Sequence, residues 1–104
     1  MQIQINTDNH ISGRDELAEQ VRTAIEGTLG HFQNQVTRIE AHLSDENSHK
    51  SNGPDKRCLL EARLEGRPPV AVTHQAEVMM QAVSGAAEKL KASLTSTLGR
   101  LHDR

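Results

Sequence analysis

The chain has 104 residues, a formal net charge of −2 and a single aromatic residue, Phe32. This length predicts one domain over residues 1–104, and the composition predicts an aliphatic core. A charge so close to neutral excludes a strong basic field over the whole surface, so binding to nucleic acid would require a local patch of basic side chains.

The first half of the chain predicts a strand, a helix and a second strand. Residues 2–6 alternate polar and apolar side chains, as a half-buried strand does. Ser12 and Asp15 resemble a capping box at the start of a helix, and Gly30 is expected to end that helix. Residues 35–44 alternate again. The side chains expected to face the core are Leu17, Val21, Ala24, Ile25, Thr28 and Phe32 of the helix and Thr37, Ile39, Ala41 and Leu43 of the second strand.

The third quarter of the chain predicts a hairpin loop and two further strands. Residues 45–55 are polar and are typical of a flexible hairpin loop. Residues 66–69 are expected to form a turn, because their two prolines cannot donate ladder hydrogen bonds. A strand is expected on each side of this turn, at residues 56–65 and 70–73. The inward side chains of the longer strand are expected to be Cys58, Leu60, Ala62 and Leu64.

A long amphipathic helix is predicted over residues 77–101. Its apolar residues recur at intervals of three and four, which places them on one stripe of a helix. They are Met79, Val83, Ala86, Ala87, Leu90, Leu94, Leu98 and Leu101. Gly85 and Gly99 within this helix predict close packing against a neighbouring element, since glycine otherwise weakens a helix. His74 is interpreted as a polar residue at the start of the helix, near free backbone donors.

The predicted order is therefore β-α-β-β-β-α, an α+β fold with two helices packed on one face of a four-stranded sheet. Short connections predict that the last three strands form an antiparallel meander. The first strand is expected to pair in parallel with one of them, because a helix follows it. The other face of the sheet is left to solvent. The side chains expected on that face are Arg38, Glu40, His42, Glu61, Arg63 and Glu65.

Short motifs spread over the chain share a likeness to one family. They are Met1-Gln2-Ile3-Gln4-Ile5, His42-Leu43-Ser44-Asp45-Glu46-Asn47, Asp55-Lys56-Arg57-Cys58, Glu61-Ala62-Arg63, Thr73-His74, Met79-Met80, Ala82-Val83 and Glu88-Lys89-Leu90. With the element order and the length, they resemble the short form of the ribosome hibernation-promoting factor and protein Y family. That family includes ribosome-associated inhibitors and sigma-54 modulation proteins. The resemblance covers nearly the whole chain.

The resemblance implies a function. Members of the family bind the small ribosomal subunit near its decoding region, where messenger and transfer RNA lie, and silence translation in stationary phase or stress. Basic side chains on the two helices neutralise phosphates of folded ribosomal RNA, which is recognised more by shape than by sequence. By this resemblance we expect a translation inhibitor that excludes messenger and transfer RNA.

The sequence departs from the family pattern at several basic positions. The first helix of the family usually has several basic residues near its C-terminal half, whereas residues 24–30 have none here and only Arg22 is nearby. In the last helix Lys89 matches the lysine of the family. The arginine usually found three residues later is replaced by Ala92, and Lys91 is the closest substitute.

The candidate ribosomal-RNA-binding residues are the basic side chains near the helices and the hairpin. They are Lys89, Lys91, Arg100, Arg22, Lys56 and Arg57. Lys89 and Arg100 are expected on one flank of the last helix and Lys91 on the other. Lys56 and Arg57 could form a second patch with Lys50 and Arg67. For all of them the alternative is an ordinary solvated surface.

The sequence gives little indication of metal binding or catalysis. Its six histidines show no His-x-x-x-His spacing, and no Cys-x-x-Cys pair occurs, so we expect no metal and no other cofactor. Cys58, the only cysteine, excludes an intramolecular disulfide and is expected to be a buried core residue. Since no catalytic triad is recognisable, we expect a binding protein and not an enzyme.

No apolar run reaches the roughly 18 residues of a membrane span, and residues 1–4 lack the features of a signal peptide. We therefore expect a cytoplasmic protein with the small ribosomal subunit as its partner, and neither a membrane nor a small-molecule substrate. An alternative is a stress-related protein-interaction module with the same fold that has lost ribosome affinity. The near-neutral charge and the poverty of basic residues in the first helix favour that alternative.

Overall fold

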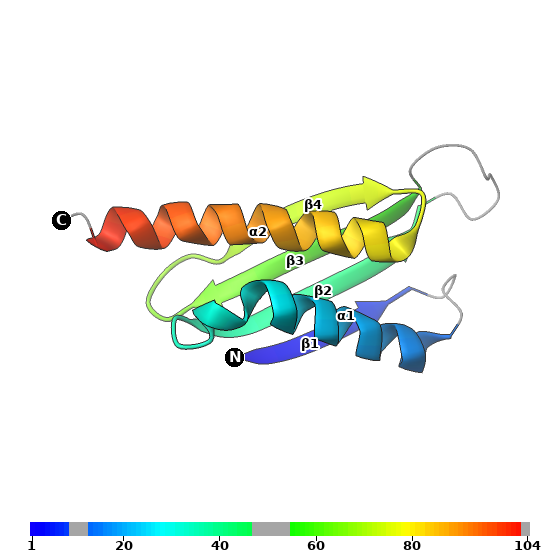
Figure 1. The fold of residues 1–104 in the computed structure, drawn as a ribbon, viewed down its shortest axis with the longest axis horizontal. Helices are drawn as coiled ribbons and strands as arrows, with labels where there is room; N and C mark the ends of the chain where they lie inside the picture. Colours follow the sequence, from blue (N-terminus) through cyan, green and yellow to red (C-terminus); the bar gives the residue numbers. More distant parts are fainter. Residues whose placement is uncertain (9–12, 47–54, 103–104) are drawn as a thin grey trace.

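The computed structural model describes residues 1–8, 13–46 and 55–102, and of residues 100–102 it describes the backbone alone. Its elements, in chain order, are β1 (Gln2–Thr7), α1 (Arg14–Leu29), the 3-10 helix η1 (Gly30–Phe32), β2 (Val36–Asp45), β3 (Lys56–Leu64), β4 (Val70–Ala76) and α2 (Met79–His102) (Figure 1). This is the predicted β-α-β-β-β-α order, so the α+β prediction is confirmed.

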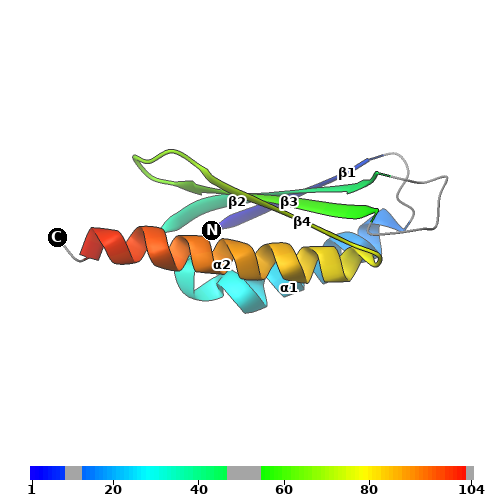
Figure 2. The same ribbon diagram turned by 90° about the horizontal axis from the view of Figure 1, so that it is seen from above.

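The four strands form one sheet in the order β1-β2-β3-β4, which leaves β1 and β4 as its edges. β1 is parallel to β2, and the other two pairs are antiparallel, as predicted. Figure 2 shows both helices on the same face of the sheet, with no described element covering the other face. α2 packs on β3 and β4, and α1 lies beside it next to β1. No described helix is both long enough and apolar enough to span a bilayer.

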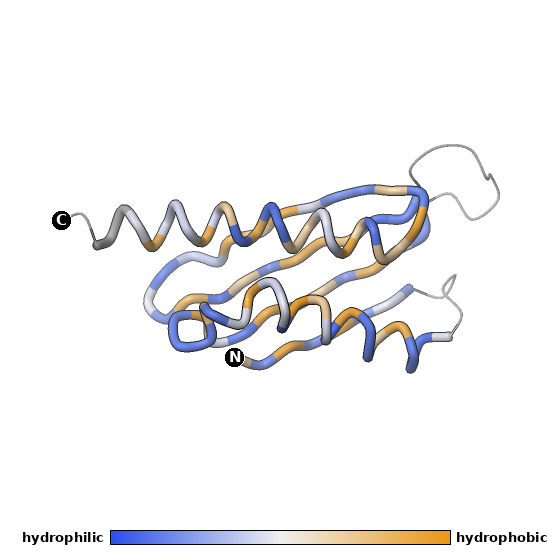
Figure 3. The backbone as a smooth tube through the Cα atoms, in the orientation of Figure 1, coloured by the Kyte–Doolittle hydropathy of each residue, from blue (hydrophilic) through white to orange (hydrophobic). Residues whose placement is uncertain are grey.

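The core lies between the helices and the sheet, and it is aliphatic as predicted. In Figure 3 apolar and polar residues alternate along the strands and around the helices. The predicted inward residues of β3 are all buried, and so are five of the predicted stripe of α2. The fully buried side chains of the two helices are Val21, Ile25, Leu29, Ala82, Val83, Ala86, Ala87, Leu90 and Leu94. Leu29 and Ala82 extend the predicted stripes, while Ala24 and Thr28 are only half-buried.

The prediction that Thr37 faces the core is wrong. The pairing register of β2 with β3 shifts between Val36 and Arg38, and such an irregularity changes which side chains face inward. Val36 is therefore buried in the inward position, while Thr37 is exposed. Its hydroxyl donates a hydrogen bond to the carbonyl oxygen of Arg63 at 3.0 Å. A strict alternation in the sequence could not indicate this shift.

The interpretation of His74 as a helix-start residue is also wrong. β4 continues to Ala76, and His74 pairs with Cys58 within the sheet. Its ring lies under Gly85 of α2, where a Cβ atom would stand only 2.1 Å from the ring atom Cδ2. The close packing predicted at Gly85 is thus confirmed. It is not found at Gly99, where no described atom beyond the adjoining residues and backbone of α2 itself lies within 4 Å of an added Cβ.

The start of α1 differs from the predicted capping box. Gly13 is the N-cap, with a left-handed φ of 63° and no side-chain hydrogen bond to the helix, and glycine adopts this conformation without a steric penalty. Ser12 lies outside the described residues. Gly30 follows the end of α1, as predicted. Of the loop predicted at 45–55, residues 47–54 likewise lie outside the described residues, and Asp45 is the last residue of β2. At the base of this segment the amide of Glu46 donates a hydrogen bond to the carbonyl of Asp55 at 2.8 Å.

Candidate nucleic-acid interface

Lys89 extends from the exposed flank of α2 to the edge of the sheet. Its Nζ donates a hydrogen bond to the carbonyl oxygen of Thr73, in β4, at 2.9 Å. This carbonyl points away from the sheet, as the pattern of the ladder shows. The amide of Glu46 bonds to the carbonyl of Asp55, which makes these two residues a bonded pair at the end of the β2–β3 ladder. Bonded and non-bonded pairs alternate along an antiparallel ladder, so the backbone groups of Leu59 point toward β2. Thr73, the partner of Leu59 in β4, is therefore in a non-bonded pair, and its backbone groups point away from the sheet.

Arg22 makes the corresponding contact at the opposite edge. Its Nη1 donates to the carbonyl oxygen of Ile3, in β1, at 3.2 Å. The amide of Asp8 bonds to the carbonyl of Leu43 at 3.1 Å. In a parallel ladder this places the backbone groups of residues 4, 6 and 8 toward β2 and those of Ile3 outward. Each helix thus supplies one cation to an outward carbonyl of an edge strand, and we call Arg22 and Lys89 the edge-capping cations.

Lys91 and Arg100 are the other two candidates on α2. Lys91 is exposed and follows Lys89 by about 200° around the helix, so it lies on the opposite flank, as predicted. Arg100 lies within α2, about three turns beyond Lys89, and its side chain is outside the described part of the structure. Unlike Lys89, Lys91 has no contact with the sheet edge in the described part of the structure, and its side chain is exposed to solvent.

The basic pair at the start of β3 is neutralised by neighbouring carboxylates. Lys56 Nζ lies 3.3 Å from Asp45 Oδ2 and 3.2 Å from Asp55 Oδ1, and Arg57 Nε lies 3.7 Å from Glu46 Oε1. The hydrogen bond to Asp55, supported by Asp45, raises the pKa of Lys56. These ion pairs balance the local positive charge at the base of the hairpin.

The second patch suggested around Lys56 does not include Arg67. Arg67 follows the end of β3, whereas Lys56 begins it, and nine residues of strand span about 30 Å. Lys50 lies outside the described residues. The candidate residues are therefore distributed over both sheet edges, the α2 flanks and the hairpin base, and they do not form one compact patch.

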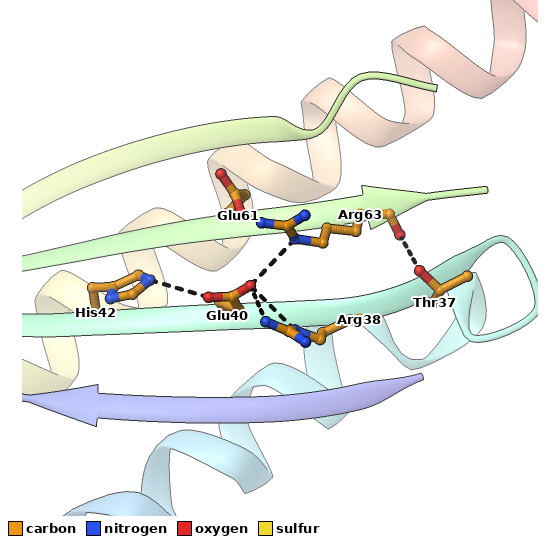
Figure 4. A network of polar contacts seen from close by, with 6 residues as sticks. All are labelled: Thr37, Arg38, Glu40, His42, Glu61 and Arg63. Atoms are coloured by element: carbon orange, nitrogen blue, oxygen red, sulfur yellow. Dashed lines mark hydrogen bonds and ion pairs between the residues drawn. The ribbon is translucent and has the colours of Figure 1, made fainter. Parts of the chain in front are cut away.

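The open face of the sheet holds a network of ion pairs centred on Glu40 (Figure 4). Glu40 Oε2 accepts hydrogen bonds from Arg38 Nε at 3.1 Å and from Arg63 Nε at 3.2 Å. Arg63 also lies 3.1 Å from Glu61, and His42 lies 3.6 Å from Glu40. The hydrogen bond from Arg38, together with the charges of both arginines, lowers the pKa of Glu40. This face is thus occupied by internally paired charges.

The lowered pKa of Glu40 predicts a specific dependence of stability on pH. Because ionised Glu40 is favoured in the folded state, its contribution is present above the ordinary carboxyl pKa and is lost as the pH falls through the lowered value. Glu40→Gln is therefore expected to reduce the urea midpoint at neutral pH, with the difference from wild type shrinking on acidification. Urea titrations from about pH 7 to pH 3 test this. Glu65→Gln controls for the loss of one carboxylate, and a constant difference across this pH range would contradict the prediction.

The described residues show no group of side chains that could hold a metal ion, and the cysteine is buried. Outside 9–12, 47–54 and the last five residues, no cluster of histidine, cysteine and acidic side chains could hold a metal ion. Cys58 is fully buried, as expected, and burial raises its pKa to about 12. A thiol with this pKa stays protonated at neutral pH and is a poor nucleophile.

The edge-capping role of Arg22 and Lys89 could not be predicted from the sequence. The spacing of Lys89 in α2 indicates its flank, but the contact with Thr73 depends on the strand order and on which carbonyls the ladder leaves free. The predicted strand ended at residue 73, whereas β4 continues to Ala76. This extension places Thr73 at the centre of β4, opposite the middle of α2, and the sequence did not indicate it.

The sequence matches the family model described as "Sigma 54 modulation protein / S30EA ribosomal protein" over residues 3–102. No curated protein matches it. The fold is similar to that of the Protein Y N-terminal domain from Thermus thermophilus, with a TM-score of 0.73 and 15% identity over 93% of this chain and 99% of that one. It is also similar to a ribosomal subunit interface protein from Coxiella burnetii, with a TM-score of 0.66 and 16% identity over 95% of this chain and 99% of that one. Because the family model spans nearly the whole sequence, this chain belongs to the sigma 54 modulation protein / S30EA ribosomal protein family.

Proposed function

We propose that this protein binds the ribosome and inhibits translation as a hibernation factor. The observation that supports this most strongly is the family match over residues 3–102. The two solved structures of similar fold point the same way, since one is a Protein Y domain and the other a ribosomal subunit interface protein. On this proposal the protein acts in the cytoplasm, as a binding protein with no chemistry of its own.

The proposed mechanism is occlusion of the decoding region of the small subunit. The helical layer would lie in an RNA-walled channel and exclude messenger and transfer RNA. Phosphates of folded RNA attract basic side chains irrespective of sequence. We assign this contact first to Lys91 and Lys89, with Arg100 on the same helix and with Arg22 on α1. Lys56 and Arg57 are weaker candidates, because they are already paired with carboxylates.

The four basic residues assigned to this contact predict a marked dependence of binding on salt. About four phosphate contacts would weaken binding by roughly 50- to 150-fold between about 50 and 200 mM salt. The test is sedimentation of a stationary-phase lysate through sucrose gradients at these two salt concentrations, with the protein detected in each fraction. Co-migration with small subunits or whole ribosomes at low salt, reduced at the higher salt, is expected. A protein found only at the top of both gradients would refute the proposal.

A second candidate function is a protein-interaction module that has the family fold but lacks ribosome affinity. The paired charges of Lys56, Arg57 and the Glu40 network favour it, because they leave few cations for RNA. Such a module would keep its partner as salt rises, since apolar contacts are not weakened by screening. Persistence of the complex at high salt, without ribosomes, would favour this second function over the first.

A further inference from the structure

The edge of β4 has the hydrogen-bonding pattern of a site for strand addition. By the alternation established above, the backbone groups of Ala71, Thr73 and Gln75 point away from the sheet. Unpaired backbone groups on an edge strand can pair with a strand of another chain. Within the described residues, Lys89 supplies the only hydrogen bond to any of these outward groups, at the carbonyl of Thr73.

The strand that best fits this edge is β4 of a second copy. β4 has seven residues, Val70–Ala76, so Thr73 is its central residue. An antiparallel pairing of two β4 strands about a two-fold axis places Thr73 opposite Thr73 of the second copy, with both sets of backbone groups turned toward each other. Ala71 then faces Gln75 of the other copy, also in a bonded pair. The side chains at these three positions are uncharged and exposed, so none of them opposes the pairing by charge.

Lys89 blocks this pairing at its centre. Its Nζ occupies the acceptor position of Thr73, where the amide of the second Thr73 would have to bind. A two-fold axis through Thr73 would also bring two Lys89 ammonium groups close together, and like charges in an interface are strongly unfavourable. Lysine at a strand edge is a known device against edge-to-edge association.

The cap that Arg22 provides on β1 does not lie at the centre of a symmetric strand pairing. Arg22 caps the carbonyl of Ile3, which is the second residue of the six in β1. A two-fold pairing of β1 would be centred near Ile5. The cap at β4 is therefore the one placed at the centre of a symmetric pairing.

We propose that the free edge of β4 is a self-association site for a second copy of this chain, and that Lys89 keeps it closed. Removal of the Lys89 charge opens the edge and produces a dimer with one continuous sheet. The proposal is independent of ribosome binding, because it concerns the isolated protein.

The test compares Lys89→Met with Lys91→Met by sedimentation velocity over a range of protein concentrations. Both variants lose one positive charge from α2 and keep a side chain of similar length, but only the first loses the contact with Thr73. Lys89→Met is expected to lower the dimer dissociation constant by about tenfold or more relative to Lys91→Met. Equal behaviour of two folded variants, checked by circular dichroism, would overturn the proposal.

A second pair of variants identifies the surface used. Thr73→Pro removes an outward amide without removing a ladder bond to β3, and proline is tolerated in this position of an edge strand. Combined with Lys89→Met, it is expected to restore the monomer. Ala71→Pro removes another outward amide and replaces Thr73→Pro if that double variant does not fold. A dimer that persists in a folded double variant would show that association uses another surface, and the proposal would be wrong.

Discussion

Leu60→Ala is expected to lower the free energy of unfolding by about 2–5 kcal/mol. Leu60 is fully buried in β3, where it pairs with Ala41 of β2 and Val72 of β4 beneath the helical layer. Truncation removes apolar contacts and leaves a cavity that the flanking strands cannot fill. Since domains of this kind have a total stability of about 5–15 kcal/mol, the loss would be a large fraction of the total. Urea denaturation measures it directly.

The adjacent residue in β3 provides the control for this prediction. Leu59 is half-buried and points to the open face of the sheet, between His42 and Thr73. Leu59→Ala changes the same atoms and is expected to cost about 1 kcal/mol or less, because solvent can occupy the vacated space. If Leu59→Ala proved as costly as Leu60→Ala, the open face would have to be covered in solution, and the assignment of the two faces would fail.

Reversal of two charges on α2, Lys89→Glu with Lys91→Glu, is expected to weaken ribosome binding by about 100-fold or more. Each charge-assisted contact to a phosphate contributes about 1.5–3 kcal/mol, and each 1.4 kcal/mol corresponds to a factor of ten in affinity. The new carboxylates would also repel the RNA backbone. Co-sedimentation of the purified variant with small subunits at low salt measures the effect.

The matched control for this double variant reverses two charges away from α2. Arg63→Glu with Arg67→Glu changes the net charge by the same amount, but it acts on the open face and on the turn after β3. Because Arg63 pairs with Glu40 and Glu61, its reversal also costs stability, so circular dichroism is used to establish that the control is folded. The folded control is expected to lose only several-fold in affinity, through long-range electrostatics. Equal losses in the two variants would mean that binding follows net charge, and the assignment of α2 as the contact surface would be wrong.

Most of the fold could be predicted from the sequence because local patterns and global packing agree. The stripe of α2 and the alternation of β3 each indicate one inward face, and two helices can cover only one side of four strands. The errors arose where a non-local contact overrides the local pattern. The register shift beside Thr37 and the position of His74 under Gly85 both depend on the neighbouring element, which the local sequence does not reveal.

The candidate interface was less predictable, for a different physical reason. The residue types and their flanks follow from helical spacing, but the state of each charge depends on its partners. Lys56 and Arg57 meet carboxylates that are adjacent only because β2 and β3 are paired. Lys89 has two partners on our proposals, the carbonyl of Thr73 and an RNA phosphate. Its ammonium group has three N–H donors, so a phosphate could bind beside the 2.9 Å hydrogen bond to Thr73 or replace it.

The contact between His74 and Gly85 has a consequence for how this sequence can diverge. An added methyl group at position 85 would overlap the imidazole ring of His74, so a larger residue there requires that the ring move or that a smaller side chain replace it. The two positions lie eleven residues apart in the chain and belong to different elements, yet a change at one of them constrains the other. We therefore expect positions 74 and 85 to vary together among sequences that keep this packing of α2 on β4.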